Sequence, residues 1–516
     1  MSRALRSLAI ILVLLGGTLP ARAAQLAALE RGTAIIDPLA LRELDRGRFG
    51  LTRVLIPERS ADIPLTDAQL FALPSMAPVR KALDDEFERY IANHKANLPN
   101  ESIGVGTSFD FQLFDRALLY SADTRFVLSG IVNRMDRAYL AETHCGEIRL
   151  IYRLTRMAVP ETSDAPSPRL PMTLNVVLSA KDRYPVGAGD VPCAEIARRW
   201  LATSDLTATG AELAAKLTAQ GGALNMSGLV IERIETNLQI AHAPKSPVRD
   251  FRTDYLMKVF DYNAQSDKFE EAPLENQIDR ERILADETLR RDFKAWLLEP
   301  KNLREFDRGT ILIPERFLAK GAVAVTPVGF APSDSQPAFG LVEGEGAHPV
   351  FSDGDVVAAL KKAAEDGGLQ NVRSVAGFER RLNDMTCSGC HQTRGIGGFH
   401  FPGADWMAAK PSNSTVVPAS PHFFGDQVRR RDILASLRDG RPPNYSRGFS
   451  SRPQLRGSTE LAGTEYEDGW GAHCYLQGAN AAGNDKSFRS WTCAEGLACQ
   501  AASPATRMGM CFVKSR

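Results

Sequence analysis

The 516-residue chain has no net charge at neutral pH, because 62 lysines and arginines balance 62 aspartates and glutamates. A protein that binds nucleic acid through its overall charge is normally basic, so this composition argues against that class. The sequence also has no nucleophile elbow, Walker loop, H-E-x-x-H motif or dinucleotide fingerprint. The usual signatures of serine hydrolases, nucleotide-binding proteins and zinc proteases are therefore missing.

Long apolar runs are scarce, and the clearest one stands near the N-terminus. Residues 8–15 are unbroken apolar, but this run is far shorter than the ~20 residues that a membrane-spanning helix needs. Two arginines precede the run, and an A-R-A cleavage sequence ends at Ala23. Residues 1–23 therefore predict a bacterial export signal. The mature protein is expected to be periplasmic or secreted, with no membrane span.

Cysteine is rare, with eight residues in the chain and none before Cys145. The absence of a cysteine beside the signal excludes lipid attachment at that point. Exported proteins keep disulfides, so the remaining cysteines are expected to form bridges or to hold a cofactor. They divide by position into two pairs and a group of four: Cys145 and Cys193; Cys387 and Cys390; Cys474, Cys493, Cys499 and Cys511. We expect a bridge between Cys145 and Cys193, the only pair in their region.

The central pair lies in a C-S-G-C-H sequence, residues 387–391, which matches the motif of covalent c-type haem attachment. Two thiols three positions apart can reach the two vinyl groups of one porphyrin, and the adjacent histidine can then face the iron. Chance predicts roughly 0.002 such sequences in a chain of this composition. The motif thus predicts one covalent haem c, held by Cys387 and Cys390 with His391 as the proximal iron ligand.

Two other interpretations of the motif stay open. The cysteine pair could form a redox disulfide, although the βαβ pattern of a thioredoxin-like site is missing around it. A zinc ion could use Cys387, Cys390, His391 and His400, although adjacent Cys390 and His391 cannot easily both ligate one tetrahedral metal.

The regions around the motif predict helices. Apolar residues at spacings of four and three indicate a helix that leads into the motif: Phe378, Leu382 and Met385. Residues 425–439 predict a second short helix, which Gly440 ends. With these helices, residues 365–455 resemble the class I monohaem cytochrome c domain. The resemblance implies a compact helical haem domain and electron transfer, or redox chemistry at the haem iron, with a redox partner protein.

Three downstream side chains are candidates for the second axial position of the iron, in this order of preference: His422, Met407 and His400. Cytochromes of this class usually carry a distal methionine well downstream, whereas Met407 lies only 16 positions after His391. His422 precedes the predicted closing helix, where a loop can fold back over the ring. An empty distal position is a fourth alternative and favours ligand-binding or peroxidase-like chemistry.

The fold class expected for the whole chain is α+β. Residues 24–260 predict an antiparallel sheet with helices, because apolar residues alternate strictly in three segments: residues 148–154, 172–178 and 234–240. Residues 261–364 predict a helical or mixed region, in which Asp286 caps a helix that Pro300 ends.

The predicted cytochrome c-like domain then follows at residues 365–455, and a small disulfide-rich module follows at residues 459–516. About 58 residues bury little core, so two bridges among its four cysteines are expected to stabilise this module. The three possible pairings of those cysteines stay open.

Two charged features have open interpretations. The segment from Arg429 to Arg456 contains eight arginines but only two aspartates. This segment predicts either a solvated linker whose arginines pair with haem propionates, or a docking surface for an acidic redox partner.

Asp136, His144 and Glu147 form either a small polar site beside the sheet or, as we prefer, only a strand end and its turn.

Two functions from different classes follow from the sequence. The first is an exported c-type haem protein that transfers electrons or carries out redox chemistry at the haem iron. The second is a secreted, disulfide-stapled binding or structural protein without a redox role. Covalent haem distinguishes the two, and whether the protein is an enzyme stays open.

Overall fold

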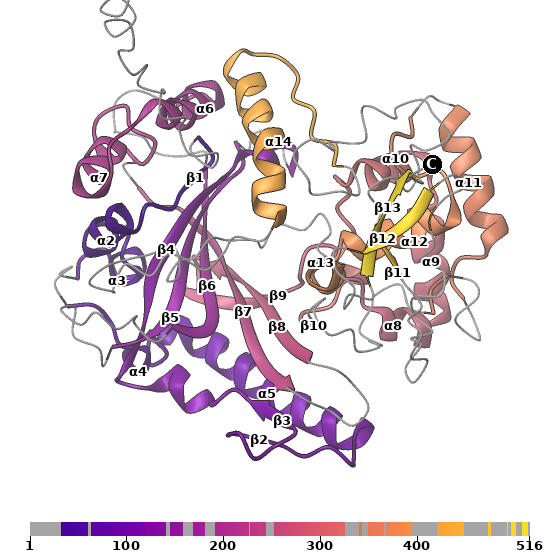
Figure 1. Ribbon diagram of the computed structural model, residues 1–516, viewed down its shortest axis with the longest axis horizontal. Helices are drawn as coiled ribbons and strands as arrows, with labels where there is room; N and C mark the ends of the chain where they lie inside the picture. Colours follow the sequence, from indigo (N-terminus) through magenta and orange to yellow (C-terminus); the bar gives the residue numbers. More distant parts are fainter. Residues whose placement is uncertain are drawn as a thin grey trace, which may run out of the picture.

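The alternating apolar segments form strands of one ten-stranded sheet in the computed structural model, and a mostly helical region lies beside this sheet (Figure 1). The protein is therefore of mixed α+β class, as predicted. The structure describes residues 32–59, 63–140, 145–157, 169–180, 191–226, 228–243, 252–325, 340–342, 349–365, 368–393, 421–447, 473–475, 493, 497–501 and 508–513.

The sheet is antiparallel except for one short parallel pair, β2 with β3. Strands β1, β4, β5, β6 and β7 follow one another across it, and β7 then pairs with both β3 and β8. Strand β8 also pairs with β9 and β10. The strands are β1 (Ala34–Ile35), β2 (Ile103–Gly104), β3 (Phe111–Leu113), β4 (Thr124–Arg134), β5 (Glu147–Arg156), β6 (Arg169–Ser179), β7 (Ile231–Ala243), β8 (Arg252–Asn263), β9 (Lys268–Ala272) and β10 (Ala322–Val325).

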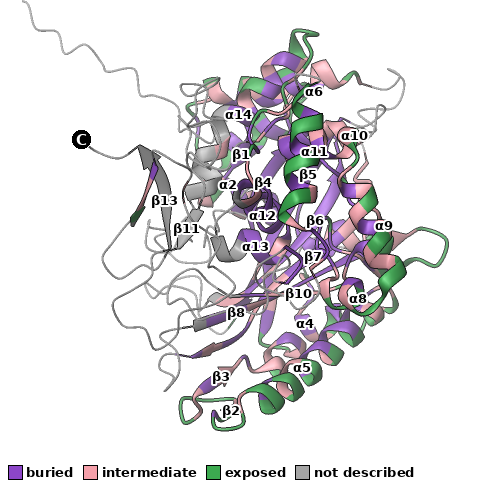
Figure 2. Ribbon diagram, turned by 90° about the vertical axis from the view of Figure 1, so that its right-hand side faces the viewer, coloured by how far each residue is buried: buried purple, intermediate pink, exposed green. Residues whose placement is uncertain are grey.

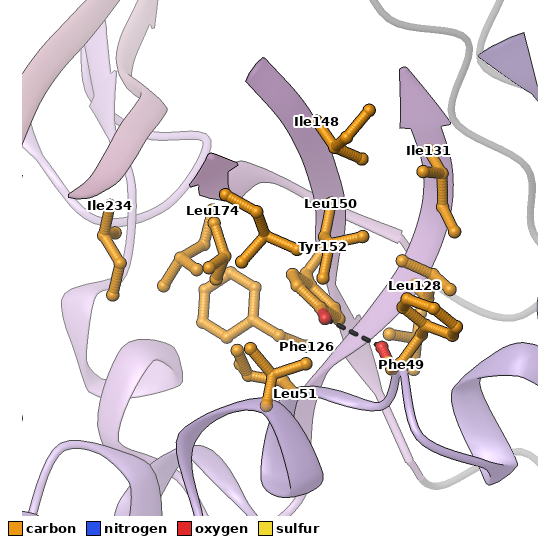
Figure 3. Packing of buried hydrophobic residues seen from close by; sticks show 14 of the residues in the cluster. Phe49, Leu51, Phe126, Leu128, Ile131, Ile148, Leu150, Tyr152, Leu174 and Ile234 are labelled. Carbon is orange, nitrogen blue, oxygen red and sulfur yellow. Dashed lines mark hydrogen bonds between the residues drawn. The ribbon is translucent and has the colours of Figure 1, made fainter. Parts of the chain in front are cut away.

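The first face of the sheet carries the apolar half of each alternating segment and packs against helices. Ile148, Leu150 and Tyr152 of β5 lie in this core with residues of β4, β6 and β7 (Figure 3). The Tyr152 hydroxyl donates a hydrogen bond to the carbonyl of Phe49 at 2.8 Å. The helices on this face are α2 (Pro38–Arg46), α3 (Leu51–Leu55), α4 (Asp67–Leu70), α5 (Ala77–Asn97), α6 (Cys193–Ala202) and α7 (Gly210–Thr218).

The second face of the sheet carries the alternate, polar positions of the same strands. Arg149 of β5 aligns with Val177 of β6, which aligns with Arg233 of β7. Glu147, Arg149 and Glu235 on this face are nevertheless buried. Alternation of apolar and polar residues is typical of strands with one solvated face. Here the helical region covers the polar face as well, and Figure 2 shows these strands buried behind α11–α13.

The helical region has its own apolar core, which includes residues from Ile278 to Met385 and also Leu497 near the C-terminus. The predicted boundary between residues 364 and 365 therefore does not separate two cores. Helices of this region are α8 (Arg280–Ala285), α9 (Glu287–Leu297), α10 (Pro300–Arg308), α11 (Asp353–Glu365), α12 (Val375–Asp384) and α13 (Cys387–Thr393). Asp286 caps α9 as predicted, accepting a hydrogen bond from the Leu289 amide, whereas Pro300 begins α10.

The helix predicted after the motif is α14 (Pro421–Arg438), and Gly440 follows it with a left-handed φ of 66°. It packs against α6 and the 3₁₀ helix η3 (Met135–Leu140) rather than closing a helical unit with α12 and α13. Leu434 of α14 belongs to the core on the first face of the sheet. The two helices that flank the motif in sequence are thus attached to different parts of the fold.

The C-terminal strands β11 (His473–Tyr475), β12 (Leu497–Ala501) and β13 (Met508–Val513) form a separate three-stranded antiparallel sheet. Cys493 and Cys499 are disulfide-bonded. The three possible pairings of the four C-terminal cysteines stay open. Among the described residues, no helix is long and apolar enough to cross a membrane.

The predicted bridge between Cys145 and Cys193 is confirmed, and it ties the start of β5 to the start of α6. Replacing both cysteines by serine is expected to lower the free energy of unfolding by about 4 kcal/mol, because the bridge closes a loop of 48 positions and so restricts the unfolded chain. Urea denaturation of the variant beside the wild type measures this loss. A loss below about 1 kcal/mol would contradict it.

Candidate functional site

The C-x-x-C-H motif borders a cavity of about 270 Å³ between α13 and the second face of the sheet. Both cysteines of the motif, Cys387 and Cys390, line it. Facing them are residues of the strands, of η3 and of the loops between elements: Arg137, Tyr139, Leu140, Arg149, Arg233, Glu235, Val259, Asp261, Pro273, Glu275, Asn276, Gly309, Glu315, Leu318 and Arg447. The cavity therefore combines two thiols, four guanidinium groups, carboxylates and apolar side chains.

The two residues between the cysteines, Ser388 and Gly389, hold the motif against the helical region through hydrogen bonds and close packing. Ser388 receives a hydrogen bond from the Gln277 amide at its hydroxyl, and its own backbone amide donates to the Gln277 oxygen at 3.0 Å. The Gly389 amide donates to the Thr386 hydroxyl at 3.0 Å. A Cβ on Gly389 would lie 2.0 Å from the Asn383 carbonyl oxygen, so only glycine fits this close approach. Tertiary contacts thus hold the start of α13 in place.

Cys387 and Cys390 are thiols, whereas Cys145, Cys193, Cys493 and Cys499 are bridged. Cys390 is buried, and the Cys387 sulfur lies 4.0 Å from the Glu275 carbonyl oxygen. Burial raises the pKa of Cys387, and the neighbouring Cys390 and Glu275 raise it further. Dithiol oxidoreductases need a thiol of lowered pKa, so this environment disfavours the redox-disulfide interpretation.

Beneath the cavity, Glu147 is the centre of a buried ion-pair network. Arg149 donates to it from Nη2 at 2.9 Å, and Arg233 donates from Nη2 at 2.7 Å. Arg137 Nε lies 3.1 Å from Glu147, and its terminal nitrogens bind Glu275. Glu235 accepts from both Arg149 and Arg233. Burial alone would raise the pKa of Glu147, but the three guanidiniums hold it well below its ordinary value.

A second network surrounds Asp136, which follows β4. Arg134 donates to this carboxylate from Nε at 2.8 Å. Arg429 of α14 donates from Nη2 at 2.7 Å, and Arg447 donates from Nη2 at 3.2 Å. These guanidiniums hold the pKa of Asp136 well below its ordinary value despite its burial. The network joins α14 and the segment after it to the end of the sheet.

Asp136 and Glu147 lie at strand ends, after β4 and at the start of β5, as preferred from the sequence, but each is also the buried centre of an ion-pair network that the sequence did not predict. His144 lies outside the described residues. The sequence reasoning missed Arg149, Arg233 and Glu235. One feature of the sequence could have indicated them: acidic and basic residues occupy the alternate positions of the predicted strands. An ordinary solvated sheet face has the same pattern, so this feature does not identify a buried network.

The described part of the arginine-rich segment, residues 429–447, is not the open docking surface or the solvated linker that the sequence allowed. Arg429 and Arg430 are buried, and Arg429 pairs with Asp136 and Asp426. Arg438 and Arg441 are exposed but pair with Asp439. Arg452 and Arg456 lie outside the described residues. Arg429 and Arg430 therefore provide internal ion pairs, and Arg438 and Arg441 already have a carboxylate partner, so these arginines do not favour an acidic partner protein.

The iron-ligand candidates are described only in part. His391 lies in α13 and His422 in the first turn of α14, but their side chains are outside the described part of the structure. His400 and Met407 lie outside the described residues altogether. Within the described ranges, no three His, Cys, Asp or Glu side chains gather as a metal site.

Comparison of the chain with protein-family models, curated proteins and solved structures finds no match. Its function is therefore inferred from the cavity, the two thiols and the charged networks around them.

Proposed function

We propose that the protein is an exported c-type haem protein, which transfers electrons or carries out redox chemistry at the haem iron. One observation carries the proposal: Cys387 and Cys390 are thiols that line the same cavity, in a C-x-x-C-H sequence at the start of α13. The raised pKa of Cys387 disfavours the alternative of a redox disulfide.

The residues around the cavity fit a haem c. Cys387 and Cys390 would hold the ring as thioethers, and His391 would be the proximal ligand of the iron. Leu140, Val259 and Leu318 offer apolar contacts for the ring. Guanidinium groups bind carboxylates bidentately, so the cavity arginines can hold propionates: Arg137, Arg149, Arg233 and Arg447. Bound haem would supply one-electron redox chemistry, and His422, Met407 or His400 would supply any second axial ligand.

The chain's own residues limit the access of water to this site, and its four arginines lie among four carboxylates, Glu235, Asp261, Glu275 and Glu315. Cys390, Glu147 and Arg149 are almost fully buried, so water has little access to the floor of the cavity. Arginine stays protonated at any physiological pH, and each buried guanidinium here has a carboxylate partner. An export signal ending near Ala23 and the Cys145–Cys193 bridge are consistent with a periplasmic or secreted site of action.

Covalent haem in protein from a host with haem-attachment machinery tests the proposal. On a denaturing gel, the wild-type band is expected to stain for haem peroxidase activity, and the Cys387→Ala/Cys390→Ala variant is expected to lose all stain. Ser388→Ala is the matched control, because it changes the same turn of α13 but keeps both thiols and should still stain. An unstained wild-type band would reject the proposal and favour the disulfide-stapled binding or structural protein without a redox role.

A further inference from the structure

Residues 275–277 form a strap between the cavity and the start of α13, and each of their side chains binds a different part of the fold. Glu275 pairs with Arg137 of η3. Asn276 is buried, and its side chain makes hydrogen bonds with the backbone of residues 311 and 313, in the loop after α10. Gln277 is buried as well, and its side chain reaches the C-x-x-C-H motif. The strap is therefore fixed to the sheet side and to the helical region before it contacts the motif.

Gln277 holds Ser388, the residue between Cys387 and Gly389, through both polar atoms of its side chain. Its Nε2 donates to the Ser388 hydroxyl at 3.0 Å. Its Oε1 accepts from the Ser388 backbone amide at 3.0 Å and from the hydroxyl at 3.1 Å. Ser388 is only 2% exposed, so water does not replace these bonds easily. Because the clamp includes a backbone amide, it fixes the first turn of α13 and not only one side chain.

The same turn places the two thiols. Cys387 packs against the apolar cluster of β8, β9 and β10, and its sulfur lies 4.0 Å from the carbonyl oxygen of Glu275 in the strap. Cys390 is buried three positions further along α13, which lies beside β10 (Figure 1). Two cysteines at this spacing can join in a disulfide. Since the structure holds them as separate thiols, closing that bond requires a movement of the turn that Gln277 clamps.

We propose that Gln277 is a positioning residue that keeps Cys387 and Cys390 as separate thiols at the cavity. The competing reaction is a balanced exchange: the two thiols lose two electrons and two protons to a disulfide such as oxidised glutathione, which becomes two glutathione thiols. The value of Gln277 for haem attachment rests on the proposed function, because a cysteine adds its S–H across a vinyl group only while it is not oxidised.

The test uses the full-length protein from a host without haem-attachment machinery, so that both thiols are unmodified. The protein is equilibrated in glutathione buffers, and differential alkylation with peptide mass spectrometry gives the oxidised fraction of the Cys387–Cys390 pair. Gln277→Leu is expected to raise the equilibrium constant for this disulfide about tenfold, because it removes every hydrogen bond of the clamp. Ser388→Ala keeps the bond from the backbone amide, so its expected increase is only about threefold.

Gln277→Glu tests the clamp by rescue, because its carboxylate still accepts hydrogen bonds from the Ser388 amide and hydroxyl. It should stay within about threefold of the wild type. The Cys145–Cys193 bridge in the same samples is the internal control, and its oxidised fraction should not change in any variant. Equal shifts in Gln277→Leu and Gln277→Glu, no shift in Gln277→Leu, or a parallel shift in the control bridge would overturn the proposal.

The same variants in a host with haem-attachment machinery show whether the clamp matters for attachment. By intact-protein mass spectrometry, Gln277→Leu should carry covalent haem on at least about twofold fewer chains than Gln277→Glu, because an oxidised pair has no S–H to add. A wild-type chain without haem would reject the proposed function, and the glutathione equilibrium would still decide the role of Gln277. Equal haem content in the two variants, with haem present in the wild type, would show that the clamp does not assist attachment.

Discussion

Replacing Asp136 by asparagine is expected to lower the free energy of unfolding by about 3–5 kcal/mol. The variant keeps the shape of the side chain but removes the charge that Arg134, Arg429 and Arg447 share. Of the described carboxylates that pair with Arg429 and Arg430, only Asp426 would then remain charged. An uncompensated buried charge is the main cost of breaking such a pair.

The loss of stability is expected to be concentrated where α14 meets the sheet. The ion pair between Arg429 and Asp136 joins these two parts, although the two residues are 293 positions apart in sequence. Hydrogen exchange should therefore show faster exchange in α14 and η3 than in β5–β7. Asp439→Asn is the matched control, because Asp439 pairs with Arg438 and Arg441 at the surface. Its expected effect is at most about 1 kcal/mol. Equal losses in the two variants would contradict the assignment of Asp136 as a structural centre.

Replacing Glu147 by glutamine is expected to cost a similar amount, about 3–5 kcal/mol at neutral pH. Glu147 pairs with Arg137, Arg149 and Arg233, so the variant leaves three arginines to share Glu235 and Glu275. Urea denaturation of the two proteins at pH 7 measures the difference. Glu212→Gln, which removes an exposed partner of Lys216, should change the stability by no more than about 0.5 kcal/mol.

The pH dependence of this effect has a definite sign. The folded-state pKa of Glu147 lies well below its ordinary value of 4.5, so the folded protein favours the ionised form. Its contribution to stability is complete above pH 4.5 and is lost as the pH falls towards the folded-state pKa. The difference between wild type and Glu147→Gln should therefore shrink as the pH falls below 4.5. A constant difference between pH 7 and pH 3 would show that the carboxylate charge is not its cause.

Local features of the chain were readable from the sequence. The alternation of Ile148, Leu150 and Tyr152 predicted the core face of β5, because successive side chains of a strand point to opposite faces. Asp286 predicted the start of α9, since a capping carboxylate needs only the amides of the next turn. The C-x-x-C-H sequence needs five consecutive residues, so it predicts a haem site without any knowledge of the fold.

The tertiary structure decided what surrounds these local features. Arg149, Arg233 and Glu235 stand at the polar positions of alternating strands, and alternation cannot show whether another layer covers the polar side of a sheet. The helical region buries that side of the sheet. A buried carboxylate without a cationic partner destabilises the fold, so the charged side chains there form an ion-pair network. The pairing of Asp136 with Arg429 was likewise invisible, since no local periodicity relates residues so far apart in the chain. The sequence by itself thus determined the strands, the helix caps, the Cys145–Cys193 bridge and the motif. Only the packing of distant segments decided that the two thiols face a buried, arginine-rich cavity. Buried charges must be compensated, and which side chains compensate one another depends on which of them the fold buries together.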